Sequence, residues 1–332
     1  MHEFGFERRN RTGKIRGQYH MGMDSSSLPT GLGIDAGGTQ TRWALAAPDG
    51  TILAEGQVAG LSALQIASAD GRAAVQATLA QLAAEVPRHA RPLRVRAGLT
   101  GYGGDAAPWQ ALLAPLFDLP AAAISLASDI EVAYLDSFAP GKGYLVYAGT
   151  GSIGAYIDVA GQFHRAGGRG VLLDDGGGGY WIAREALRHV WRNEDEQPGS
   201  WRDSPLARAL FTSIGGDDWA ASRDFIYGRE RGQIGMLALA VAASADADPA
   251  AAAILRRAGE ELARLGNALI ARYGPRPLAL SGRASSLHPS IAASMRAALP
   301  ATASLTHTVS HAHHAAARLA AASDSSNHAK QQ

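Results

Sequence analysis

The most informative part of the sequence is GLGIDAGGTQTRWALA, residues 31–46. It predicts a short apolar strand, a turn with two adjacent glycines, and a second strand in which Trp43 and Leu45 alternate with smaller residues. Glycines let the backbone turn tightly and bring its N–H groups close to a phosphate. Asp35, at the end of the first strand, has the chemistry to orient a hydrated magnesium ion. The residues expected to face phosphate in this loop are Gly37, Gly38, Thr39 and Thr41.

A second stretch of the same design begins near residue 143. The strand expected at Tyr144–Ala148 runs into a second glycine turn, and further strands follow at Ser152–Val159 and Gln162–Ala166. Three strands with a glycine turn after the first therefore occur twice, as a repeat of architecture rather than of sequence. Two α/β halves of related topology predict a cleft between them. The second loop is expected to hold phosphate through Gly149, Thr150, Gly151 and Ser152.

Both glycine turns superficially match a dinucleotide-binding pattern. Residues 149–154 read G-x-G-x-x-G, and residues 31–36 match the variant that ends in alanine. A dinucleotide fold requires such a turn to open a helix, whereas residues 155–159 and 41–47 alternate as strands do. A Walker loop is excluded because no Gly-Lys-Ser/Thr follows. Either turn alone could be an ordinary hairpin connection, but the occurrence of both at matching places favours phosphate binding.

The composition limits the classes of function. The chain has 332 residues, 46% of them hydrophobic, with 39 glycines, no cysteine and a net charge of +1. A sizeable core is therefore expected. The lack of cysteine excludes disulfides, thiolate nucleophiles and cysteine-held iron–sulfur clusters, and it agrees with a reducing cytoplasm. The near-zero net charge argues against a nucleic-acid partner. The sequence contains no run of 18 apolar residues, so no membrane span is expected.

The hydrophobic pattern divides the chain into four parts. Residues 1–27 are polar and basic and lack the apolar centre of a signal peptide, so a disordered leader is expected. Residues 323–332 form a similar tail. The two halves between them are expected at 28–139 and 140–322, with the boundary in a Pro-Gly-Lys-Gly stretch. Helices are expected at 66–86, 109–117, 130–138, 179–192, 204–214, 232–243, 250–272, 286–298 and 311–322, and further strands at 51–59, 93–99, 124–127 and 278–281.

Several short motifs occur in an order that resembles a known family. Both loops resemble the phosphate motifs of the actin/hexokinase/Hsp70 superfamily. Within it, the sequence is most similar to the N-acetylglucosamine and glucosamine kinases of the BadF/BadG/BcrA/BcrD-type ATPases. The resemblance implies two ribonuclease-H-like domains with ATP and Mg²⁺ in the cleft, phosphorylation of an amino sugar at its 6-hydroxyl, and an arrangement compatible with a homodimer. The other motifs that carry it are Gly60–Leu64, Leu99–Gly101, Ser128-Asp129, Ala166–Gly168 and Asp175 through Trp181.

The resemblance also implies roles for single residues. Asp129 follows the strand at 124–127 and begins a helix, where family members place the general base; an ordinary helix N-cap is the alternative interpretation. Gly282, in Leu280–Ala284, is expected to let the backbone approach adenine. The residues expected to contact the sugar are Ser62, Thr100, Gly168, Arg169 and Asp175.

Three positions depart from the family pattern. Arg169 stands where tryptophan is usual, Gly176 where a sugar-binding glutamate is usual, and Arg283 where a second glycine is usual. An alternative function is therefore a degenerate kinase or regulator that binds nucleotide and sugar without phosphate transfer. Dehydratase-activating ATPases of the same family need cysteines, which are absent. A sugar-kinase-like transcription factor needs a helix-turn-helix before the first loop, and residues 1–27 lack its apolar period.

A histidine cluster near the carboxyl end has the spacing of metal ligands. His307, His311 and His314 are spaced i, i+4, i+7, and His313 is adjacent. The nearest acidic residue along the chain is Asp324, and His307 is expected to precede the helix. A surface or interdomain helix is therefore favoured over a metal site.

Overall fold

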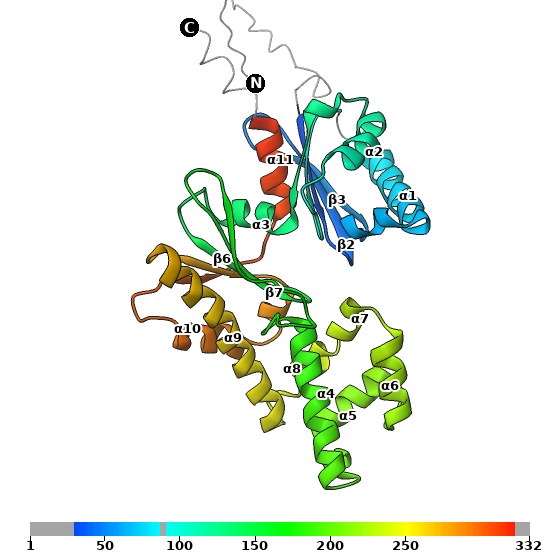
Figure 1. The fold of residues 1–332 in the computed structure, drawn as a ribbon, viewed down its shortest axis with the longest axis vertical. Coiled ribbons are helices and arrows are strands. Elements are labelled where there is room, and N and C mark those ends of the chain that lie inside the picture. Colours follow the sequence, from blue (N-terminus) through cyan, green and yellow to red (C-terminus); the bar gives the residue numbers. More distant parts are fainter. Residues whose placement is uncertain (1–29, 87–90, 323–332) are drawn as a thin grey trace, which may run out of the picture.

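The computed structural model describes residues 30–86 and 91–322, so the expected leader at 1–27 and tail at 323–332 lie outside these ranges. The chain has an α/β fold with two mixed five-stranded sheets (Figure 1). In the first sheet the strand order is β3-β2-β1-β4-β5. The first three strands pair antiparallel as a meander, and the last two join β1 in parallel. Their bounds are β1 (Thr30–Ala36), β2 (Gln40–Ala46), β3 (Ile52–Ala59), β4 (Pro92–Leu99) and β5 (Ile124–Ser128).

The second sheet repeats this plan with the order β10-β9-β6-β7-β8. Again three strands form an antiparallel meander and two join the first of them in parallel. The duplicated α/β architecture expected from the two glycine turns is therefore confirmed. The bounds are β6 (Tyr144–Ala148), β7 (Ser152–Ile157), β8 (Phe163–Gly167), β9 (Leu278–Ser281) and β10 (Leu305–His307).

Helices cover both faces of the first sheet. Leu32 and Ile34 point from β1 into a core with α1 (Ala69–Glu85) and α2 (Ala107–Phe117). The alternate residues of β1 face α3 (Asp129–Ser137) and α11 (Ala312–Ala322) on the other side. We call this sheet with its four helices the first half.

The last helix packs on the first sheet, although the boundary expected from the sequence groups residues 312–322 with the second half. A Cβ on Gly33 would lie 2.1 Å from the carbonyl oxygen of His313, so only glycine lets α11 approach the backbone of β1 so closely. Figure 1 shows α11 beside β1 and β2, far from the helices that precede it in sequence. The chain thus crosses between the halves twice, after α3 and after β10.

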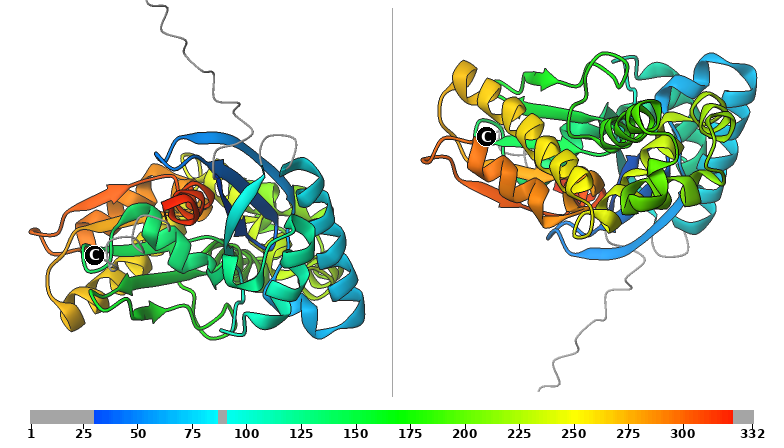
Figure 2. Two further views of the ribbon diagram at one scale, coloured as in Figure 1. Left: turned by 90° about the horizontal axis from the view of Figure 1, so that it is seen from above. Right: turned by 90° about the horizontal axis from the view of Figure 1, so that it is seen from below.

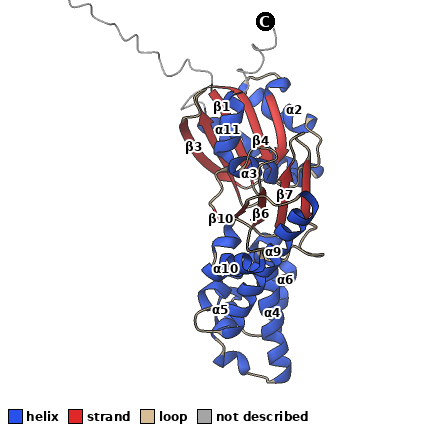
Figure 3. Ribbon diagram, turned by 90° about the vertical axis from the view of Figure 1, so that its left-hand side faces the viewer, coloured by secondary structure: helices blue, strands red, loops and turns tan. Residues whose placement is uncertain are grey.

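The second half contains a large helical part. Figure 3 shows a group of helices gathered at one end of the molecule below the two sheets, whereas α9 packs against the second sheet, as Figure 2 shows. They are α4 (Gly179–Glu196), α5 (Pro205–Ile214), α6 (Trp219–Gly228), α7 (Arg231–Gly235), α8 (Ala238–Ser244), α9 (Pro249–Tyr273) and α10 (Pro289–Ala298).

Two sequence expectations fail in this helical part. The single helix expected at 232–243 is wrong, because it breaks into α7 and α8 at residues 236–237. The sequence analysis does not predict α6, a short helix in which Ser222 alone is buried. Among the described residues no single helix is long and apolar enough to cross a membrane. The pair 231–244 and 249–273 passes that test only together, with a bend of 118°.

Candidate active site

The first glycine loop connects β1 to β2 at the carboxyl end of β1. The Gly37 amide donates to the Gln40 carbonyl at 3.1 Å, and the Leu61 amide donates to the Gly37 carbonyl at 3.1 Å. Gly38 and Thr39 are exposed. The open edge of the loop is therefore Gly37–Thr39. Thr41, in contrast, is fully buried in β2 and its Oγ1 has no hydrogen-bond partner in the described chain.

Asp129 lies in the first turn of α3 without capping it. Ser128 is the N-cap, since its Oγ accepts from the Glu131 amide at 3.3 Å while Glu131 accepts from the Ser128 amide at 2.9 Å. The Asp129 carboxylate instead accepts from the Ile130 amide at 2.8 Å and from the Thr100 hydroxyl. The interpretation of Asp129 as an ordinary N-cap is therefore wrong.

A short hydrogen-bond network joins three of the predicted segments around this carboxylate. The Thr100 amide donates to the Ala36 carbonyl at 2.9 Å, which ties the end of β4 to the end of β1. The Thr100 carbonyl accepts from the Ser62 hydroxyl at 3.2 Å and from the Ala63 amide at 2.8 Å. Ser62, Thr100, Asp129 and the first loop therefore form one hydrogen-bonded unit.

At this edge of the sheet the charge of Asp129 affects the ionisation of Asp35. Burial and the nearby charge of Asp129 raise the pKa of Asp35 to about 7, against the opposing charge of Arg42. Burial also raises the pKa of Asp129, although its hydrogen bonds from Thr100 and Ile130 oppose the shift. An uncompensated pair of buried acids is costly when both are ionised. The site is therefore suited to a group that brings positive charge.

Tyr147 on β6 links this unit to the second half. Burial and the charges of Asp35 and Asp129 raise the pKa of its phenol to about 12, while Arg283 and Arg42 oppose the shift. These side chains are thus electrostatic neighbours although they come from both sheets. Sequence reasoning missed Tyr147 and Arg42, because each sits inside a strand where alternation predicts only a packing role.

The second glycine loop is held tightly to the start of α4. The Gly179 amide donates to the Gly149 carbonyl at 2.8 Å, and the Tyr180 amide donates to the Thr150 carbonyl at 2.9 Å. Ser152 is buried, and its hydroxyl donates to the Gly176 carbonyl at 2.7 Å. The hydroxyl of Ser152 is therefore used within the protein.

The glycine-rich segment 167–179 folds back on this second loop. The Gly168 amide donates to the Ser152 carbonyl at 3.1 Å. Asp175 is 8% exposed, has a left-handed backbone, and accepts from the Gly170 amide at 3.1 Å. Burial raises the pKa of Asp175, and the charge of Arg231 opposes the shift. Gly168 and Asp175 thus lie together beside Gly151, whereas the side chain of Arg169 is exposed.

Glu261 of α9 occupies the space that a side chain at position 176 would need. A Cβ on Gly176 would lie 2.8 Å from a carboxylate oxygen of Glu261 and 3.0 Å from its Cβ. Arg264 donates to Glu261 at 3.0 Å and to Asp174 at 2.9 Å, which fixes this carboxylate beside the loop. The chain therefore lacks the expected glutamate but supplies a carboxylate from another element.

Gly282 closes the second sheet against its own loop. Its φ is +97°, and a Cβ there would lie 2.3 Å from the Ala148 carbonyl oxygen. The glycine is therefore required by the end of β6, whatever it does for a nucleotide. Arg283 is exposed next to it and carries the charge felt by Tyr147.

The two glycine loops meet at α7. A Cβ on Gly232 would lie 3.9 Å from Oγ1 of Thr39, and one on Gly235 would lie 3.6 Å from Cγ2 of Thr150. The structure thus places the first loop near one end of a five-residue helix and the second loop near the other.

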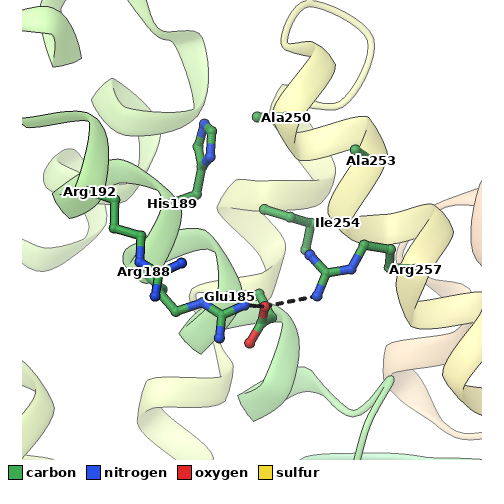
Figure 4. Close-up of a pocket in the computed structure, with 8 residues that line it drawn as sticks. All are labelled: Glu185, Arg188, His189, Arg192, Ala250, Ala253, Ile254 and Arg257. Carbon is green, nitrogen blue, oxygen red and sulfur yellow. Dashed lines mark hydrogen bonds and ion pairs between the residues drawn. The ribbon is translucent and has the colours of Figure 1, made fainter. Parts of the chain in front are cut away.

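A separate pocket lies between α4 and α9, and none of the predicted site residues lines it (Figure 4). Its charged centre is Glu185, which is 4% exposed. Glu185 accepts from Arg257 at 3.0 Å and from Arg188. Arginine side chains therefore already neutralise the carboxylate, and we interpret the pocket as a structural ion-pair cluster.

One known family matches most of the chain. A model of the BadF/BadG/BcrA/BcrD ATPase family matches residues 32–294. The chain belongs to this family. The match includes both glycine loops, Asp129 and Gly282, so the resemblance predicted from the motifs is confirmed. A search of the curated proteins gives no match.

Solved structures share the fold of this family member. A protein from Chromobacterium violaceum, provisionally named an N-acetylglucosamine kinase, is 27% identical with a TM-score of 0.67, over 88% of this chain and 99% of that one. A similarly named protein from Porphyromonas gingivalis is 18% identical with a TM-score of 0.64, over 86% and 96%. A ROK family glucokinase from Streptomyces griseus, in complex with glucose and AMPPNP, is 17% identical with a TM-score of 0.55, over 89% and 98%.

Proposed function

We propose that this protein is an ATP-dependent kinase of an amino sugar, glucosamine or N-acetylglucosamine, acting at the 6-hydroxyl. The observation that carries the proposal is Asp129, whose carboxylate is bonded to Thr100 beside Asp35 and the first glycine loop. Membership of an ATPase family and the name of the Chromobacterium relative support the same function. ATP is the phosphate donor in this proposal, with its phosphates at Gly37–Thr39 and Gly149–Gly151.

Asp129 would act as the general base. It accepts the proton of the sugar hydroxyl while that oxygen forms a bond to the γ-phosphorus, and the bond to the bridging oxygen breaks to release ADP. Its raised pKa improves its basicity, and the hydrogen bond from Thr100 keeps its carboxylate ionised and oriented. Ser62 and Thr100 lie in the same network, which agrees with sugar binding on this side.

The residues at the end of β1 fit a magnesium ion. The carboxylate of Asp35 is destabilised by burial and by the charge of Asp129, so a bound cation would relieve both costs. Carboxylates and water are the ligands that Mg²⁺ prefers. Asp35 would hold the ion through its water shell, and the ion would supply charge neutralisation at the phosphates.

The amino-sugar assignment rests on the family resemblance and on the name of the Chromobacterium relative, and the residues that the resemblance implies come from two segments. The first segment belongs to the first half and contains Ser62, Thr100 and Asp129. The other is the glycine-rich segment that folds back on the second glycine loop, with Gly168, Arg169 and Asp175. We propose that Glu261 contributes the carboxylate that the family places at position 176, since it fills that space.

A coupled assay of ADP release tests the proposal. Glucosamine, N-acetylglucosamine, N-acetylmuramic acid and glucose are compared at fixed Mg²⁺ and ATP. Turnover with an amino sugar is expected, and Asp129→Asn should lower kcat by about 10²–10⁴-fold. Asp70→Asn is the matched control, because Asp70 is also an aspartate in the first turn of a helix of this half but is exposed. No turnover with any hexose, while ATP still binds, would refute the proposal.

The same experiment separates the alternative, a degenerate kinase that binds sugar without phosphate transfer. The departures at Gly176, Arg169 and Arg283 favour this alternative. Calorimetric binding of an amino sugar with no ADP release, in the wild-type chain, would support it. Sugar-dependent turnover that is lost in Asp129→Asn would exclude it.

A further inference from the structure

Three histidines gather where the chain enters α11, on the opposite face of the first sheet from α1 and α2. His311 directly precedes the helix, and His313 and His314 lie in its first turn. One ligand nitrogen from each lies within 4.8 Å of the others. The rings of His311 and His314 are stacked with centroids 5.0 Å apart, and His313 lies 4.3 Å from His314.

A carboxylate from a remote strand completes this cluster. Glu55 of β3 contacts Nε2 of His314 at 2.5 Å and Nε2 of His313 at 3.3 Å through the same oxygen. Along the sequence the nearest acidic residue is Asp324, and the histidines are therefore expected to lack a carboxylate neighbour. This expectation is wrong, because Glu55 lies beside two of them. The reason is topological, because α11 returns to the first half and lies across β1, β2 and β3. His307, in contrast, faces Ser285 at 3.0 Å and stays outside the cluster.

One histidine of the cluster is buried. His313 is 5% exposed, and its Nδ1 is buried without a hydrogen-bond partner in the described part of the chain. Nε2 of the same ring faces the Glu55 carboxylate, so a buried ring nitrogen and a carboxylate oxygen already lie together.

We propose that His311, His313, His314 and Glu55 bind one divalent ion of the zinc class. Three imidazole nitrogens and one carboxylate oxygen are the donor types of tetrahedral zinc sites, whereas Mg²⁺ prefers oxygen ligands. Zinc–nitrogen bonds of about 2.0–2.1 Å require the ligand atoms to approach one another to roughly 3.4 Å. Side-chain rotation of His311, which is exposed, and of Glu55 can close the cluster from its present spacing.

The ion would fasten one of the two connections between the halves. Residues 308–311 run from β10 of the second sheet to α11 on the first, and the His311 amide donates to Asp136 at 2.8 Å. An ion held by His311 and Glu55 would tie the end of this connection to the edge of the first sheet. The site is separate from the proposed kinase residues, so its presence does not depend on the proposed function.

Metal titration of the full chain tests the proposal. After chelator treatment, calorimetry with Zn²⁺ should show one site with Kd below about 1 µM and no displacement by millimolar Mg²⁺. His314→Gln and Glu55→Gln should each weaken binding at least about tenfold, since even loss of an outer partner of a metal ligand costs 10–100-fold. His307→Gln is the matched control and should bind as the wild type does. Zn²⁺ should also raise the Tm of the wild type more than that of either variant.

Two outcomes would overturn the assignment. One is the absence of a stoichiometric site in the wild type. The other is zinc affinity that survives both His314→Gln and Glu55→Gln, which would assign the ion to histidines elsewhere in the chain. Should either variant fail to fold by circular dichroism, His311→Gln at an exposed position takes its place, and it should abolish the intense visible bands that Co²⁺ gives in a tetrahedral nitrogen site of the wild type.

Discussion

Replacing Asp35 by asparagine should stabilise the free protein, and the gain should depend on pH. Burial and the charge of Asp129 raise the pKa of Asp35 from an ordinary 3.8 to about 7. Below pH 3.8 both folded and unfolded chains carry the proton, and the folded state has no penalty. As the pH rises to 7 the unfolded chain loses its proton first, so stability falls across this window. At about 1.36 kcal/mol per pKa unit, the difference between these two pKa values limits the loss of unfolding free energy to about 4 kcal/mol.

Urea denaturation of wild type and Asp35→Asn between pH 5 and 8 measures this effect. The advantage of the variant should grow with pH and level off above pH 7, while Mg²⁺ with ATP should stabilise the wild type alone. Asp49→Asn is the control, because a hydrogen bond from Thr51 lowers the pKa of this exposed carboxyl and its effect should be constant across the window. A pH-independent difference for Asp35→Asn would refute the electrostatic account of the site.

Three further changes test other parts of the structure. Thr100→Val removes the hydroxyl that donates to the proposed base, so the pKa of that base should rise and the acid limb of the pH–kcat profile should move up by about 1–2 pH units. Gly33→Ala should destabilise the fold by about 1–3 kcal/mol or more in urea titrations, because its Cβ would strike α11, while Gly103→Ala, in open space, should be near neutral. Gly176→Glu should lower the Tm through its clash with Glu261, and adding Glu261→Ala should restore the Tm, whereas additive losses would contradict the shared space.

The sequence predicts those parts of the site that local chain geometry forms. Each glycine turn follows a short apolar strand, so its position at a sheet edge follows from the strand pattern. The position of Asp129 between a strand and a helix follows from the same pattern, whereas its role as a base is implied by the family resemblance. Parallel strands bring their carboxyl ends to one edge, which explains why Thr100 and Asp129 meet.

The remaining features depend on contacts between remote segments. Nothing in residues 312–322 indicates that they pack on β1, because an alanine-rich helix fits against any surface that allows close approach. Glu55 and the histidines are separated by 258 or 259 positions, so their meeting follows only from the return of α11. Glu261 likewise comes from a helix whose charge pattern is that of a solvated face, and its place beside Gly176 is fixed by Arg264.

The helix α3 carries Asp129 at its amino end and contacts both segments that join the two halves near its carboxyl end. Its first turn holds Asp129 against Thr100, within the first half. Its last residues lead into the first connection, where the Tyr134 hydroxyl donates to the Gly143 carbonyl at 3.0 Å. Asp136 accepts a hydrogen bond from the His311 amide at the end of the second connection. The helix itself is shared by the two halves, because Ile130, Val132 and Ala133 in its first turns are buried in the core that contains β6 and β7. Displacement of the second half would therefore act on the whole length of α3, including the turn that carries Asp129.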